Sequence, residues 1–123
     1  MDTIFAQATA AGKAGLAVVR ISGPDAIASV AQMAGPLPRV GRTLRRLRDR
    51  VGALLDEGLV LIFPAGQSFT GEETVELHLH GGTAVVAGVL RCLGDQVGLR
   101  PAVAGEFTRR ALENGRLDLA QVE

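Results

Sequence analysis

Residues 74–83 read Thr74-Val75-Glu76-Leu77-His78-Leu79-His80-Gly81-Gly82-Thr83, and this segment carries the clearest structural signal in the chain. Its valine and leucines at 75, 77 and 79 alternate with polar residues, which is typical of a strand with one buried face. The two glycines then predict a helix start, and an apolar stripe follows at helical spacing: Val85, Val86, Val89, Leu90, Leu93. A strand that leads directly into an amphipathic helix predicts a sheet with helices packed on it.

The flanking sequence extends this pattern in both directions. Apolar runs at 4–8, 16–21, 59–63 and 99–103 predict further strands, and helical spacing predicts helices at 26–34 and 106–113. The arginine-rich stretch 39–50 predicts an exposed strand or loop. The resulting order, β-β-α-β-β-β-α-β-α, indicates an α+β fold in which helices pack against a mixed β-sheet.

Composition limits the function classes. The chain has 123 residues, enough for one domain, and its 13 basic and 13 acidic residues cancel. Whole-domain attraction to nucleic acid or to an anionic membrane is therefore not expected. The single cysteine, Cys92, excludes an internal disulfide and suits a reducing compartment. Without a run of roughly 20 apolar residues or a signal-peptide pattern, we expect a cytoplasmic protein with no membrane contact.

Polar residues of the segment 74–83 suggest two binding chemistries, each with a simpler alternative. Glu76, His78 and His80 share one strand face and could hold zinc, but a polar sheet face is the favoured interpretation because no fourth ligand is evident. The turn at 81–83 could bind an anion at a helix N-terminus. It is not a Walker A loop, so nucleotide binding by this chain alone is not expected.

Three further features could be functional or structural. Residues 39–50 contain six arginines that could contact RNA phosphates, although a solvated face is the commoner explanation. Cys92 lies beside an apolar helical stripe, which favours a packed thiol over a nucleophile. Arg20 falls within an apolar strand and needs a partner, either a ligand or a structural acid.

Four segments together resemble the N-terminal domain of the MnmE/TrmE family of bacterial tRNA-modifying GTPases. Each is weak alone, but they keep the family's order and approximate spacing along the whole chain. The four segments are Asp2-Thr3-Ile4; Val18-Val19-Arg20-Ile21-Ser22-Gly23; the stretch 63–82 with Ser68-Phe69-Thr70-Gly71-Glu72 and His80-Gly81-Gly82; and 105–121 with Gly105-Glu106-Phe107-Thr108, Asn114-Gly115 and Leu117-Asp118-Leu119.

The resemblance implies a fold, a cofactor and partners. Members of the family are multidomain GTPases that add a carboxymethylaminomethyl or aminomethyl group at C5 of the wobble uridine of certain tRNAs, together with the flavoprotein MnmG (GidA). Their first domain is similar to half of the folate-binding aminomethyltransferase fold. It forms a homodimer and binds 5-formyltetrahydrofolate or 5,10-methylenetetrahydrofolate as the one-carbon donor.

The same resemblance implies domain limits. Residues 1–118 correspond to the folate-binding and dimer-forming domain, and residues 119–123 to the start of a helical domain. GTP, magnesium and potassium would bind a GTPase domain beyond Glu123, so we expect no GTP hydrolysis by this chain alone.

Carried over residue by residue, the folate-binding positions of the family fall on Arg20, Glu76 and Arg116. The last is usually lysine in the family, and arginine keeps the charge but not the geometry. Ala10-Ala11 and Ala104 also depart from positions where the family usually has proline. One carboxylate can accept two parallel hydrogen bonds, from the amino group and from the ring N–H of a pterin, which suits Glu76. The two arginines can donate hydrogen bonds to carboxylate or carbonyl oxygens of the ligand.

Other functions remain open at this point. The domain could be a pure dimerisation or assembly module with an unused pocket, or a tRNA-contacting module that uses residues 39–50. A self-standing folate-dependent aminomethyl transferase is disfavoured, because the chain is too short for that two-half fold and shows no convincing general acid–base pair.

Overall fold

The computed structural model describes residues 2–8 and 16–116. The predicted start of a helical domain at residue 119 and the Ala10-Ala11 departure lie outside these described residues.

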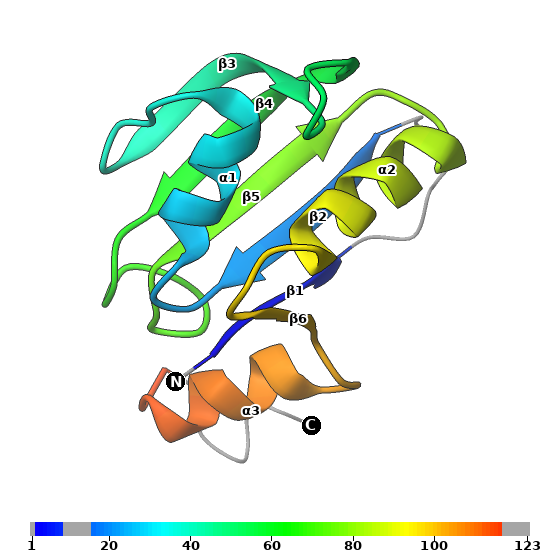
Figure 1. Cartoon of the computed structure of the whole chain (residues 1–123). Helices are drawn as coiled ribbons and strands as arrows, with labels where there is room; N and C mark the ends of the chain where they lie inside the picture. Colours follow the sequence, from blue (N-terminus) through cyan, green and yellow to red (C-terminus); the bar gives the residue numbers. More distant parts are fainter. Residues whose placement is uncertain (1, 9–15, 117–123) are drawn as a thin grey trace.

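In the described part of the chain, six strands form one sheet in the order β3-β4-β5-β2-β1-β6. Strands β1 and β6 are parallel and the other neighbouring pairs are antiparallel, so the sheet is mixed, as predicted. The α+β class and the order of elements are confirmed (Figure 1). The elements are β1 Thr3–Gln7, β2 Ala17–Ser22, α1 Ala26–Ala34, β3 Gly41–Arg48, β4 Leu54–Phe63, β5 Thr74–Leu79, α2 Thr83–Gly94, β6 Leu99–Pro101 and α3 Glu106–Glu113.

Helices α1 and α2 cover one face of the sheet, and the core lies beneath them (Figure 1). Val19, Leu77 and Val60 are fully buried on neighbouring strands, and Val30 of α1 and Val89 of α2 belong to the same cluster. Burying one such aliphatic side chain contributes about 1.5–3 kcal/mol. The alternation in β5 is confirmed, because its odd-numbered residues enter this core while Glu76 and His78 remain partly exposed.

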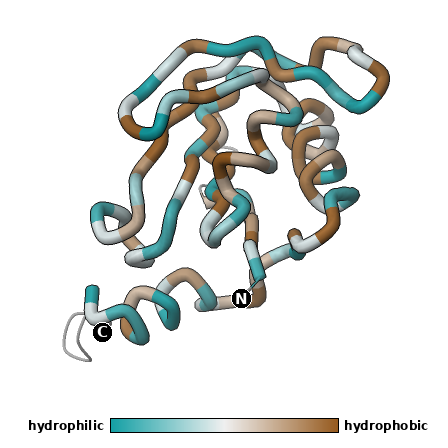
Figure 2. The backbone as a smooth tube through the Cα atoms, turned by 60° about the vertical axis from the view of Figure 1, so that its left-hand side comes forward, coloured by the Kyte–Doolittle hydropathy of each residue, from teal (hydrophilic) through white to brown (hydrophobic). Residues whose placement is uncertain are grey.

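Helix α3 is different in composition and in place. It lies beyond the β6 side of the sheet, close to the start of β1 (Figure 1), and Figure 2 shows hydrophilic and hydrophobic residues mixed along it. Its buried residues are Glu106, Arg110 and Ala111. Charged side chains rather than an aliphatic stripe therefore hold this helix against the rest of the fold.

Within the segment 39–50, residues 41–48 form the edge strand β3, so the strand alternative is confirmed for most of the segment. Leu47 anchors it, since this side chain is fully buried in the core while its neighbours are largely exposed. Strand β4 begins at Leu54, five residues before the predicted start at 59. Residues 54–58 lack a clear apolar alternation, and their strand conformation comes from pairing with β3. Sequence periodicity does not reveal such pairing.

Candidate functional site

Arg20 and Glu76 meet on the sheet face opposite α1 and α2. They are direct cross-strand neighbours in the β2–β5 register. The Nε and Nη2 atoms of Arg20 both lie 3.1 Å from Oε2 of Glu76. Both side chains are about one-fifth exposed, at 24 % and 18 %. The partner that Arg20 requires is therefore Glu76, the other predicted site residue on this face.

Two phenyl rings flank the same guanidinium group. The Cζ atom of Arg20 is 5.5 Å from the ring centroid of Phe69 and 5.5 Å from that of Phe107. Phe69 belongs to the loop between β4 and β5, and Phe107 to the first turn of α3. Rings at this distance attract a cation through their negative faces. Three separate segments of the chain thus converge on Arg20.

A cavity of about 370 Å³ opens beside this group. Arg20 and the two phenylalanines line it, and the remaining lining residues come from the end of β1, the turn before α3 and α3 itself. Arg20 uses two of its N–H groups on Glu76, and a guanidinium carries five. Hydrogen-bond donors therefore remain for a guest in a cavity with aromatic walls.

Arg116, the third predicted site residue, follows α3 and contacts the β4–β5 loop. Its Nη1 atom donates to the carbonyl oxygen of Gly66 at 3.0 Å, and the residue is exposed. Among the described residues, this hydrogen bond goes to the loop and not to Glu76. The loop that it contacts is the one that carries Phe69, so Arg20 and Arg116 contact different residues of the same loop, and the three predicted residues do not form one cluster.

Buried hydroxyl groups hold this loop against β2. Ser22 Oγ lies 2.7 Å from Thr70 Oγ1 and donates to Glu72 at 2.9 Å. At the loop's tight turn, Gly71 has a φ of +85°, and a Cβ added there would lie 2.8 Å from the Cβ of Asn114. Glycine is required at this position both by backbone conformation and by the close approach of the residue after α3.

Sequence reasoning missed a cluster of charges that attaches α3. Arg110 is 8 % exposed and donates to Glu72 at 3.0 Å, to Asp2 at 2.7 Å and to Glu106 at 3.3 Å. Arg100 also contacts Glu106, with a hydrogen bond of 2.8 Å from Nη1. The i, i+4 spacing of Glu106 and Arg110 was the available signal, but such spacing is common on exposed helices.

This acid–arginine cluster shifts the ionisation of its acids. Hydrogen bonds from Arg100 outweigh the desolvation of Glu106 and lower the pKa of its carboxyl group to about 2. The pKa of Asp2 is also lowered, first by its hydrogen bond to Arg100 and next by that to Arg110. Both acids are therefore charged at neutral pH, and they anchor the helix that carries Phe107.

His78 of β5 and His80, which follows this strand, both have protein partners. His78 Nε2 lies 3.4 Å from Oε1 of Glu76, and His80 Nδ1 lies 3.3 Å from the carbonyl oxygen of Glu57. Across residues 2–8 and 16–116, no three histidine, cysteine or acidic side chains are arranged to hold a metal ion. Glu76 thus contacts Arg20 through Oε2 and His78 through Oε1.

Comparison with known proteins agrees with this arrangement of motifs. Residues 3–116 match the family described as GTP-binding protein TrmE N-terminus. The chain belongs to the TrmE N-terminal family. The match spans every element of the described fold, from β1 to the third residue after α3, and includes Arg20, Glu76 and Arg116.

Relatives of this TrmE-type chain share much of its sequence. It is 59 % identical over 124 residues to the tRNA modification GTPase MnmE of Ruegeria pomeroyi, and 58 % identical over 123 residues to that of Cereibacter sphaeroides. A third MnmE, from Rhodospirillum rubrum, is 53 % identical over 137 residues. Each alignment covers 100 % of this chain but only 29–30 % of the relative. The chain therefore spans less than a third of the relatives' length.

The helices of the described residues are all too short or too polar to cross a bilayer.

Proposed function

We propose that this chain is the module that binds a reduced folate and pairs two copies of a tRNA-modification GTPase. Family membership supports the setting, because the relatives named above are tRNA modification GTPases. In the complete protein, the folate would supply the one-carbon unit added at C5 of the wobble uridine. MnmG would be the flavoprotein partner in the cytoplasm, and GTP, magnesium and potassium would bind a separate GTPase domain.

The observation that carries the proposal is the Arg20–Glu76 pair beside an aromatic-walled cavity. A pterin is a flat ring that can lie against Phe69 or Phe107. Its amino group and ring N–H lie side by side, and Glu76 is the acid nearest the cavity's arginine. An ionised carboxylate has about four acceptor positions, so Glu76 can accept from the pterin while keeping contact with Arg20.

Arg116 suits the other end of the ligand. A folate tail carries carboxylates, and an exposed guanidinium can bind one of them with two parallel hydrogen bonds. The side chain lies at the loop that carries Phe69, and its present acceptor is a neutral carbonyl group. A carboxylate is a stronger acceptor than that carbonyl, so the exchange would favour the ligand.

Pairing of two copies is supported by the open face of the sheet. Leu59, Leu61 and Val18 lie in register with the polar site residues on the face that α1 and α2 leave uncovered. Leu44 on the edge strand is 60 % exposed on the same face. Apolar residues beside a half-open cavity suit a second copy that covers the face and completes the walls, as in the two halves of the aminomethyltransferase fold.

Calorimetric titration of the chain with 5-formyltetrahydrofolate tests the proposal. We expect Arg20→Ala and Glu76→Ala each to weaken binding at least tenfold, which corresponds to about 1.4 kcal/mol. The matched control is Arg109→Ala, which removes an arginine that is 60 % exposed on α3 and outside the cavity. Its effect should stay within about twofold. Unchanged affinity in both site variants would reject the folate assignment.

A further inference from the structure

We propose that the β3–β4 hairpin and the cavity beside it form an RNA-binding surface, in which arginines hold phosphates and the cavity receives a nucleobase. The inference rests on the proposed function, since that function places a tRNA next to the protein. It concerns the face of the sheet covered by α1 and α2, so it is separate from the folate cavity.

Charge is segregated along the chain. Formal net charge is zero, yet residues 39–50 contain six of the 13 basic residues and one of the 13 acidic residues. The rest of the chain is accordingly acidic. Phosphate binding depends on local positive potential rather than on net charge, because charges more than about 10 Å away are screened at moderate salt.

The arginines of β3 divide between the two faces of the sheet. Leu47 is buried in the core with α1 and α2, and strand alternation places Arg45 on the same side. Arg42 and Arg46 alternate to the open face. A bulge between Leu47 and Arg48 then changes the register, and both Arg48 and Arg50 line the cavity on the helix side.

Protein contacts neutralise these arginines only weakly. Arg48 donates to the neutral carbonyl oxygen of Gly52 at 3.1 Å, and Arg45 donates to the hydroxyl of Thr43 at 3.2 Å. The pair between Arg46 and Glu57 spans 3.6 Å with both side chains more than half exposed. Exposed pairs of this kind contribute about 1 kcal/mol or less, so phosphates can displace these contacts at little cost.

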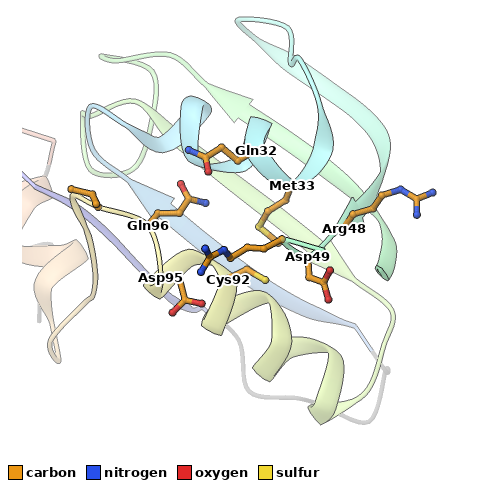
Figure 3. A pocket seen from close by; sticks show the side chains of 9 residues that line it. Gln32, Met33, Arg48, Asp49, Cys92, Asp95 and Gln96 are labelled. Atoms are coloured by element: carbon orange, nitrogen blue, oxygen red, sulfur yellow. The ribbon is translucent and has the colours of Figure 1, made fainter. Parts of the chain in front are cut away.

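The cavity beside the hairpin has a volume of about 570 Å³. Figure 3 shows side chains from α1, from the hairpin and from the end of α2 around it, with Met33 and Cys92 at its centre. Its rim contains both donors and acceptors: Gln32, Arg48, Asp49, Arg50, Asp95 and Gln96. A small apolar floor with mixed polar groups suits a nucleobase, whose edge also mixes donors and acceptors.

The carboxylates of this rim argue against an acidic peptide as the partner. Asp49 and Asp95 can accept hydrogen bonds from the amino group of a base, whereas the carboxylate side chains of an acidic peptide offer no such donor. The use of arginine rather than lysine points the same way, since guanidinium groups bind phosphate with two parallel hydrogen bonds. Arginines could also merely protect an edge strand from pairing with other chains, and the experiment separates that role.

Binding of a fluorescein-labelled, unmodified tRNA transcript to the 123-residue chain, followed by anisotropy over a salt series, tests the surface. The double variant Arg48→Gln, Arg50→Gln removes two charges at the cavity. The matched control Arg42→Gln, Arg46→Gln removes two charges from the open face of the same hairpin strand. We expect the first to weaken binding at least tenfold and to lower the salt slope by about two, and the second to change affinity by about twofold.

Cys92, the single cysteine of the chain, provides a second readout that needs no substitution. It lines the cavity and is partly buried, and burial raises the pKa of its thiol, so its reaction with a maleimide is slow. We expect the tRNA transcript to slow this labelling further. We also expect the variants with altered arginines to keep the folate affinity of the unaltered chain, which shows that they are folded.

Three results would overturn the RNA-binding surface. They are equal loss of tRNA affinity in both double variants, Cys92 labelling that is unaffected by saturating tRNA, and binding of polyglutamate as tight as that of tRNA. Edge protection alone would leave tRNA affinity unchanged and increase aggregation of the variants. Failure of folate binding with tRNA binding intact would count against the proposed folate site and not against this surface.

Discussion

Arg20 on β2 and Glu76 on β5 are separated by 56 residues in sequence and form a cross-strand ion pair with N–O distances of 3.1 Å. Opposite charges directly across an antiparallel pair contribute about 0.2–1 kcal/mol. We expect a double-mutant cycle with Arg20→Met and Glu76→Gln, measured by urea unfolding, to give a coupling energy in this range. A coupling indistinguishable from zero would contradict the ion pair.

Arg110 should be the most important single charge for stability. Its guanidinium is 8 % exposed and bonds three acids from separate segments, so Arg110→Met leaves the nearly buried Glu72 without its cation and removes one of the arginines that contact Glu106. Breaking a buried pair from one side costs about 3–5 kcal/mol. Thermal and urea unfolding should show this loss, whereas the neighbouring Arg109→Met, at a 60 % exposed position, should cost about 1 kcal/mol or less.

Stability should fall in acid through Glu106. The folded-state pKa of this carboxyl group is about 2, below its ordinary value of 4.5, because Arg100 and other donors favour the charged form. A lowered pKa contributes stability that is fully present above about pH 4.5 and is lost as pH falls through about 2. Urea unfolding between these pH values should show the decline, and Glu106→Gln should flatten it. If the free energy of unfolding of that variant fell equally steeply with pH, other acids would be responsible for the loss of stability.

Leu61 provides a test of dimer formation. It lies on the open face beside Glu76 in the β4–β5 register and is partly exposed. We expect the unaltered chain to have the mass of a dimer by light scattering at micromolar concentration, and Leu61→Asp to have the mass of a monomer, because a charge would be desolvated in the contact. Circular dichroism should confirm that the variant is folded. A monomeric unaltered chain with full folate affinity would contradict the paired module.

The β4–β5 loop offers a matched pair of glycines. Gly71 and Gly66 both have positive φ, at +85° and +87°, but an added Cβ meets Asn114 only at the first and nothing within 4 Å at the second. Both alanine variants carry the backbone cost of about 1 kcal/mol, and only Gly71→Ala displaces the loop from α3. We therefore expect Gly71→Ala to weaken folate binding several-fold more than Gly66→Ala, by calorimetry. Equal affinities would show that the loop position is unimportant for the site.

The fold was largely predictable because its signals are local. Apolar alternation in β5, the glycines before α2 and the helical stripes of α1 and α2 each depend on a few neighbouring residues. The extension of β4 to Leu54 was not predictable in this way, since it depends on pairing with β3. The folate-site residues came from a resemblance of motifs, while the two phenylalanines around Arg20 became visible only once three segments were placed together.

Local patterns thus account for the kind and order of the strands and helices and for which side of β5 is polar. They do not account for the choice of partners. Arg20 pairs with Glu76, and Arg110 bonds Asp2 across 108 positions in sequence, because sheet register and the docking of α3 bring those charges together. Strand alternation and helical spacing are set by residues a few positions apart in sequence. Each of these contacts instead depends on how the whole sheet and α3 pack together.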